Sequence, residues 1–268
     1  MSMTWNPAQY LRFAGERLRP ALDLLARIPL DNPRTIVDLG CGAGNVTALL
    51  GKRWPYARII GVDASADMLR EARAATRNDS RFSFFAADLG QWRPDAQVDL
   101  VYSNAALHWL PDHAALFARV ATMVAPDGVL AVQMPDNFRA PSHTNIAIIA
   151  RGERWRAKLD RVVRDPPVAT AADYFAWLSP LMTEVDIWLT EYLQVLPPGK
   201  DGEHPVAAWT QGTWLLPFLD ALDKEERAEF MRDYTRRLAL DYPPEGDGRT
   251  LFPFRRLFIV ATRKGSNR

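Results

Sequence analysis

Short apolar runs alternate with stretches of helical periodicity through the first half of the chain. The apolar runs span residues 36–39, 58–62, 82–87, 98–103 and 129–134. The stretches between them carry apolar residues at three- and four-residue spacing, as on one face of a helix. This alternation predicts a mostly parallel sheet with right-handed crossovers and with helices on both faces.

The alternation stops after Pro135, where helical patterns interrupted by prolines begin. Two of the later helical segments are candidates for a lid, and Pro20 is expected to break or kink the helix at the start of the chain. With 268 residues, one domain of residues 1–268 with a lid is favoured, although the length alone allows two. The helical segments are 1–30, 136–185 and 205–248, and the strand-like segments are 186–195 and 255–262.

A glycine-rich turn follows the first apolar run and precedes a helical stretch. It runs from Val37 to Gly44, with Asp38 at the end of the strand and glycines spaced as G-x-G-x-G. These glycines permit backbone conformations and close approaches that a Cβ would prevent. Dinucleotide folds place a third glycine where this chain has Asn45, and they bind a pyrophosphate. The carboxylate beside this turn therefore favours a cationic ligand.

Polar residues also follow the next three apolar runs. Asp63 ends the second run, Asp88 follows the third, and Asn104 to Trp109 follow the fourth. Because ligands of open α/β sheets bind outside the carboxyl ends of the strands, we expect these residues to converge at one edge. An acid about 20 residues beyond the glycines is placed to bind ribose hydroxyls, whereas a turn or helix-cap role is the alternative for both acids.

Together these motifs resemble the class I S-adenosylmethionine-dependent methyltransferases. The resemblance covers a cofactor-binding core at residues 31–134, and it implies an α/β, Rossmann-like fold: a doubly wound, mostly parallel seven-stranded sheet with a C-terminal hairpin and a helical lid. It implies that the glycine turn surrounds the methionine part of the cofactor and that Asp63 binds the ribose. The expected S-adenosylmethionine contacts are Asp38, Gly40, Cys41, Gly42, Asn45, Asp63, Ala64, Met68, Asp88, Leu89, Asn104 and Ala105.

Further segments resemble a narrower family, the trans-aconitate methyltransferases, over nearly the whole chain. This resemblance implies methyl transfer to a small polycarboxylic acid, most specifically trans-aconitate, with a monomethyl ester and S-adenosylhomocysteine as products. A carboxylate with a reference pKa near ~4 is ionised at neutral pH and needs no general base. It needs anion recognition, for which the planar fork of arginine is suited. The segments are 5–7, 16–25, 187–188, 217–222 and 253–261.

Seven residues are candidates for binding the acid. Arg17 is expected to share a helical face with Tyr10, and Arg256 lies in the last strand-like segment. His108, the catalytic candidate, would donate to the acid or act as a base, with a core or cap role as the alternative. Tryptophans would wall a water-poor pocket, although packing is the default for each. The candidates are Trp5, Tyr10, Arg17, His108, Trp109, Trp209 and Arg256.

Composition excludes several classes of protein. The formal net charge of +1, without a run of basic residues, disfavours a nucleic-acid partner. Cys41 is the single cysteine, so no intrachain disulfide forms, and no cysteine or histidine spacing matches a metal site. No apolar stretch has a membrane-spanning length, and the start lacks a signal pattern. We expect a cytoplasmic enzyme without a catalytic metal, acting on a small acid as a monomer or weak dimer.

Two other enzyme functions stay open on the sequence alone. A methyltransferase for phenols or amines would keep the same fold and would use His108 as a base. A nicotinamide-dependent oxidoreductase would also use a glycine-rich turn and Asp63. Asn45 in place of the third glycine, together with Asp38 and Asp88, disfavours the oxidoreductase.

Overall fold

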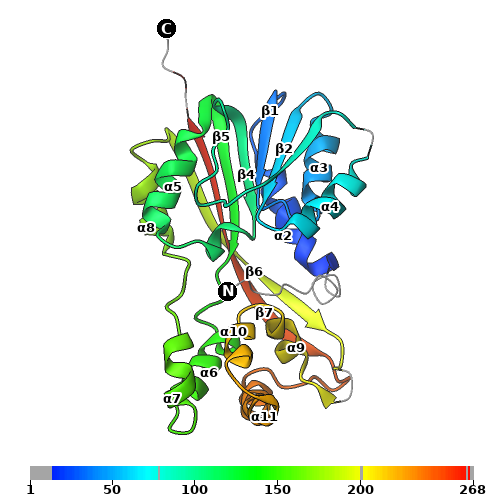
Figure 1. Cartoon of the computed structure of the whole chain (residues 1–268), viewed down its shortest axis with the longest axis vertical. Helices are drawn as coiled ribbons and strands as arrows, with labels where there is room; N and C mark the ends of the chain where they lie inside the picture. Colours follow the sequence, from blue (N-terminus) through cyan, green and yellow to red (C-terminus); the bar gives the residue numbers. More distant parts are fainter. Residues whose placement is uncertain (1–13, 78, 200–201, 264, 266–268) are drawn as a thin grey trace. The chain divides into compact units, whose positions relative to one another are not determined.

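The computed structural model describes residues 14–77, 79–199, 202–263 and 265. They form one seven-stranded sheet in the order β3-β2-β1-β4-β5-β7-β6 (Figure 1). Strands β1 to β5 pair in parallel, and β7 pairs antiparallel with β5, so the predicted fold class is confirmed. The strands are β1 (Thr35–Leu39), β2 (Arg58–Asp63), β3 (Phe82–Ala86), β4 (Val98–Asn104), β5 (Val124–Pro135), β6 (Glu184–Leu196) and β7 (Thr250–Arg263).

The described residues divide into two compact units. The sheet unit comprises residues 17–135, 167–190 and those from 256 onward, and the helical unit contains 136–166 and 191–255. The helices of the sheet unit are α2 (Ala14–Ala26, which begins just before the boundary), α3 (Asn45–Arg53), α4 (Ala66–Ala75), η1 (Leu107–Trp109), α5 (His113–Thr122) and α8 (Ala171–Leu178). Those of the helical unit are α6 (Pro141–Ala150), α7 (Arg156–Leu159), η2 (Asp160–Val162), α9 (Pro205–Gln211), α10 (Leu216–Asp220) and α11 (Lys224–Asp241).

The first described helix continues through its proline. We expected Pro20 to break or kink this helix, but α2 runs unbroken from Ala14 to Ala26. A proline removes one backbone hydrogen bond, whereas the helix buries Ala21, Leu24 and neighbouring side chains. The hydroxyl of Tyr102 in β4 also donates to the carbonyl of Ala21 at 3.2 Å. Packing against the sheet therefore outweighs the lost hydrogen bond, and the expectation of a break is wrong.

The helical segment predicted at 136–185 is shared between the two units. Helices α6 and α7 lie in the helical unit, where α6, α9 and α11 pack on one another. Helix α8 belongs to the sheet unit and packs on α5, beside which it lies in Figure 1. Its Tyr174 hydroxyl contacts Nδ1 of His113 at 2.5 Å. The segment 136–185 therefore belongs partly to each unit, and its role as a lid stays a prediction.

Candidate active site

Four polar side chains lie on one face of the sheet near the carboxyl ends of its parallel strands. Asp38 in β1 pairs with Tyr102 in β4, and two residues further Asn104 pairs with Gln133 in β5. Pro135, two residues after Gln133 in β5, pairs with Arg256 in β7. Paired residues and alternate residues of a strand share a face, so Asp38, Asn104, Gln133 and Arg256 do so too. The strand order reverses between β1 and β4, which is where open α/β sheets bind ligands.

The glycine turn between β1 and α3 has the close packing that its sequence predicts. Gly40 and Gly42 have φ values of +78° and +53°, in the left-handed region that favours glycine. A Cβ on Gly40 would lie 2.1 Å from the Cβ of Ala106, whereas a Cβ on Gly42 would meet nothing within 4 Å. The Gly40 backbone therefore packs tightly on the segment after β4, and the turn leaves open space beside Gly42.

Two carboxylates flank the glycine turn. Asp38 is 2% exposed, and its Oδ2 accepts a hydrogen bond from Oγ1 of Thr47 at 2.7 Å. Burial raises the pKa of Asp38 to about 7, against the lowering effect of Thr47 and with a smaller raising effect from Asp63. Oδ2 of Asp63 accepts from the Gly42 amide at 2.9 Å, and its Oδ1 accepts from the Ser65 amide at 2.8 Å. Asp63 thus joins the glycine turn to the start of α4.

The other expected cofactor residues near β2 and β3 lie in the turns after these strands or at the start of α4. Ala64 is exposed, and Met68 is half-buried in the first turn of α4. Asp88 is exposed and its Oδ1 accepts from the Gly90 amide at 2.8 Å, which is the turn role that we gave as the alternative. The carbonyl of Leu89 accepts from Arg119 at 2.6 Å. These contacts order the turns and leave the ligand roles of the side chains as predictions.

The segment after β4 brings a histidine beside an arginine. Ala105 has a φ of +54°, a strained value for a residue with a Cβ, and its amide donates to the carbonyl of Gln133 at 2.9 Å. His108 is buried in η1, while Trp109 is exposed and its ring centroid lies 4.7 Å from that of His108. Burial, then the positive charge of Arg256, lowers the pKa of His108 to about 3. His108 is therefore neutral at physiological pH, and Arg256 is a buried cation, 6% exposed.

The remaining candidates are Trp5, Tyr10, Arg17 and Trp209. Trp5 and Tyr10 lie outside the described residues, and Arg17 lies in α2. Trp209 is 5% exposed in the hydrophobic core of the helical unit, with ring centroids of Phe252 and Phe254 both at 5.8 Å. Its position fits the packing role that we gave as the default for a tryptophan.

Two further turn residues have simple environments. Cys41 is buried, and burial followed by the charges of Asp38 and Asp63 raises the pKa of its thiol. The thiol is therefore protonated and unreactive, in line with a packing role in the turn. Asn45 is exposed and opens α3 directly after Gly44.

Sequence reasoning missed Gln133. Its side chain is 0% exposed, and neither Oε1 nor Nε2 has a hydrogen-bond partner among the described residues. The same holds for Oδ1 of its register neighbour Asn104. A buried unpaired amide is costly, and such atoms at a strand end are what a bound ligand would satisfy. The signal available in the sequence was an amide near the end of an otherwise apolar strand.

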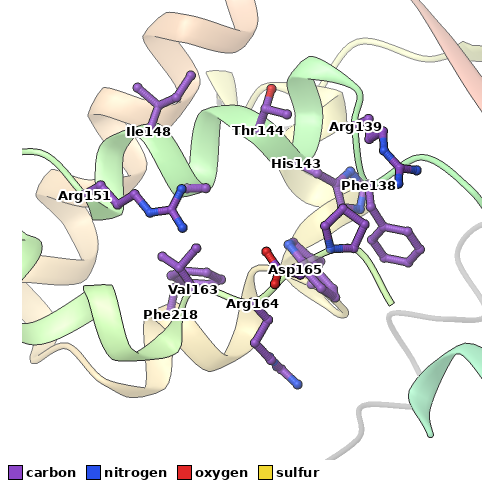
Figure 2. Close-up of a pocket in the computed structure, with 13 residues that line it drawn as sticks. Phe138, Arg139, His143, Thr144, Ile148, Arg151, Val163, Arg164, Asp165 and Phe218 are labelled. Atoms are coloured by element: carbon purple, nitrogen blue, oxygen red, sulfur yellow. The ribbon is translucent and has the colours of Figure 1, made fainter. Parts of the chain in front are cut away.

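The helical unit contains a cavity of about 290 Å³ (Figure 2). Figure 2 shows Phe138 and Arg139 at one end and Arg151 and Phe218 at the other. Arg139 lies 3.8 Å from a carboxylate oxygen of Asp136, and Arg151 lies 3.6 Å from one of Asp160. The arginines that line the cavity are thus partly balanced by acids.

Comparison with known proteins decides the family. A model described as a methyltransferase domain matches residues 36–128. Trans-aconitate 2-methyltransferase of Azoarcus sp. is 46% identical over 97% of this chain and 99% of its own length. The enzymes of that name from Methylobacterium nodulans and Escherichia coli O139:H28 are 47% and 43% identical, each over 97% of this chain and 98% of their own. The chain belongs to the trans-aconitate 2-methyltransferase family. Both resemblances inferred from its motifs are confirmed.

Solved structures with little sequence identity share the fold of this trans-aconitate 2-methyltransferase family member. A putative methyltransferase of Bacillus halodurans superimposes with a TM-score of 0.58 at 14% identity, over 92% of this chain and 100% of that one. Phosphoethanolamine N-methyltransferase 2 of Haemonchus contortus, solved with S-adenosyl-L-methionine, gives a TM-score of 0.57 at 16% identity, over 96% of this chain and 56% of that one. At these identities the likeness shows the fold alone.

Neither a metal cluster nor a membrane-spanning helix is found among the described residues. They contain no group of three or more histidine, cysteine, aspartate or glutamate residues placed to hold a metal ion. No helix among them is both long enough and apolar enough to span a membrane.

Proposed function

We propose that this protein transfers the methyl group of S-adenosylmethionine to a carboxylate of trans-aconitate. The products are a monomethyl ester and S-adenosylhomocysteine. The observation that carries this proposal is the 43–47% identity to trans-aconitate 2-methyltransferases over 97% of the chain. The environments of His108 and Arg256 support it, because a neutral histidine and a buried cation suit the binding of a carboxylate.

The residues around the glycine turn fit the methyl donor. When bound, S-adenosylmethionine supplies a methyl group on a positively charged sulfur; a carboxylate oxygen can bond to the methyl carbon in line with the sulfur, which leaves as S-adenosylhomocysteine. Gly42 leaves room for a ligand close to the backbone, and Asp38 offers a carboxyl group to a cationic one. We assign the ribose to Asp63, which keeps acceptor capacity beyond its two amide contacts. The adenine is assigned to Met68, Asp88 and Leu89.

The acceptor needs no general base. A carboxylate with a reference pKa near ~4 is already ionised at neutral pH. His108, with a pKa of about 3, is a poor base, so its neutral ring is assigned the role of hydrogen-bond donor to the acid. A phenol or an amine would need its proton removed, and His108 is unsuited to that task. The carboxylate acceptor therefore fits this site better than the phenol or amine alternative.

Arg256 is assigned to a carboxylate of the acid. A guanidinium buried beside a neutral histidine is a strong partner for a carboxylate, because hydrogen bonds between charged groups strengthen away from water. Trp109, next to His108, is assigned to the wall of the substrate site. Trp5, Tyr10 and Arg17 stay candidates from the sequence.

The wider setting of the reaction also stays a prediction. A net charge of +1 gives no attraction for nucleic acid, and a small acid needs no partner protein. We therefore retain the predictions of a cytoplasmic enzyme that is a monomer or weak dimer.

Methyl-labelled S-adenosylmethionine tests the proposal. The purified protein is incubated with trans-aconitate, cis-aconitate, citrate, a phenol or an amine, and the label in each product is tested for release by alkali. The expected result is alkali-labile label with trans-aconitate, at a rate well above that with the other acceptors. Label on the phenol or amine alone would contradict the assignment of trans-aconitate as the substrate. No label with any acceptor would contradict methyltransferase activity itself.

A further inference from the structure

Gln133 is a fully buried side chain whose polar atoms make no hydrogen bond within the described part of the chain. It is 0% exposed on β5, and both of its amide atoms lack a hydrogen-bond partner among the described residues. The neighbours that precede and follow it on the strand, Val132 and Met134, are also 0% exposed. A methionine or leucine would fill the same place without burying an unpaired amide, so folding alone does not account for glutamine here.

The position of Gln133 places it on the substrate side of the candidate site. It pairs with Asn104 in β4 on one side and with Phe258 in β7 on the other. Arg256 lies on the same face two residues from Phe258, opposite Pro135. The glycine turn follows β1, which β4 separates from β5. The amide therefore lies beside the strand of the buried arginine, one strand further from the glycine turn than Asn104.

We propose that Gln133 binds the acid substrate, with its Nε2 donating a hydrogen bond to a substrate carboxylate on the same sheet face as Arg256. This inference rests on the proposed function. An amide N–H is a neutral donor, so it adds recognition of a carboxylate without adding charge. The carbonyl Oε1 needs a donor instead, for which water that hydrates the acid is sufficient. The acid and its hydration water thus satisfy both atoms, which have no hydrogen-bond partner among the described residues.

An isosteric substitution separates this role from a structural one. In Gln133→Met, the KM for trans-aconitate is expected to rise about 10- to 100-fold, as for loss of a hydrogen bond to a charged group. The Kd for S-adenosylmethionine, measured by calorimetry, should change less than twofold. The melting temperature without ligand should rise by about 2 to 4 °C, because the unpaired amide is gone. Gln133→Glu should raise KM further, because its carboxylate repels the acid.

Met134→Leu is the matched control on the same strand. Met134 is equally buried but faces the other side of the sheet, so KM and Kd should stay at their wild-type values. A Gln133→Met variant with wild-type KM and a lower melting temperature would overturn the proposal in favour of a structural role. A higher Kd for S-adenosylmethionine with an unchanged KM for trans-aconitate would overturn the proposal, because Gln133 would then bind the cofactor and not the acid. If the wild-type protein does not methylate trans-aconitate, the proposed function itself fails.

Discussion

The substitution Gly40→Ala tests how the glycine turn is held, and Gly42→Ala provides its matched control. Both glycines have positive φ values, so alanine at either position pays the same kind of backbone cost, about 1–2 kcal/mol. The two positions differ in their surroundings. The added methyl group would lie 2.1 Å from the Cβ of Ala106 at position 40 and would meet nothing within 4 Å at position 42.

The magnitudes follow from this difference. Forcing a methyl group into a packed site costs about 1–3 kcal/mol, so Gly40→Ala should lower the free energy of unfolding by about 2–5 kcal/mol in total. Gly42→Ala should lower it by the backbone cost alone, about 1–2 kcal/mol. Because the space beside Gly42 is assigned to the cofactor, the second variant should weaken S-adenosylmethionine binding more than its effect on stability would indicate.

Urea unfolding followed by tryptophan fluorescence gives the stabilities, and calorimetric titration gives the cofactor affinities. Equal losses of unfolding free energy in the two variants would show that the contact of Gly40 with Ala106 does not constrain the turn. Full cofactor affinity in Gly42→Ala would show that no ligand approaches the backbone there. Either result would refute the description of the turn as tightly packed at Gly40 and open to a ligand at Gly42.

Three further substitutions, one of them with a control variant, test other parts of the structure. The pKa of Asp38 is raised to about 7, so the folded state holds an extra proton between about pH 4 and 7. In urea unfolding, the stability of the wild type relative to Asp38→Asn should therefore fall by roughly 1.4 kcal/mol per pH unit across that range and level off above it. A stability difference that does not change with pH would contradict the raised pKa. Arg256→Gln should raise the KM for trans-aconitate about 10- to 100-fold in steady-state kinetics and leave the Kd for S-adenosylmethionine unchanged in calorimetry. The control Arg70→Gln replaces an exposed arginine and should change neither the KM nor the Kd. Tyr174→Phe removes the hydroxyl that contacts His113 and should cost about 1–3 kcal/mol of stability in thermal melts, while methylation activity at 25 °C is retained.

The glycine turn and the strand ends could be predicted because their signals are local. Apolar runs ending in Asp63 or Asn104 mark strands that stop at a polar residue, and the spacing of the glycines fixes the turn. A mostly parallel sheet with right-handed crossovers then followed from the alternation of strand and helix patterns. These features depend on residues close together in the sequence.

The rest depends on contacts between distant residues. Gln133 became a candidate once its register with Asn104 and its full burial were known. Helix α8 falls in the sheet unit because Tyr174 packs on α5, which its own helical pattern does not reveal. The continuation of α2 through Pro20 likewise depends on packing against the sheet. Trp209 could not be told apart from a pocket residue by type alone, since buried aromatic residues serve both roles.

A single reaction with unlabelled trans-aconitate as the only acceptor tests the central claim most directly. S-adenosylhomocysteine and alkali-labile methyl ester are quantified together by mass spectrometry over the course of the reaction. The account predicts one ester formed for each S-adenosylhomocysteine, with no other methylated product. S-adenosylhomocysteine formed without ester, or a methyl group that resists alkali, would contradict carboxylate methylation by this protein.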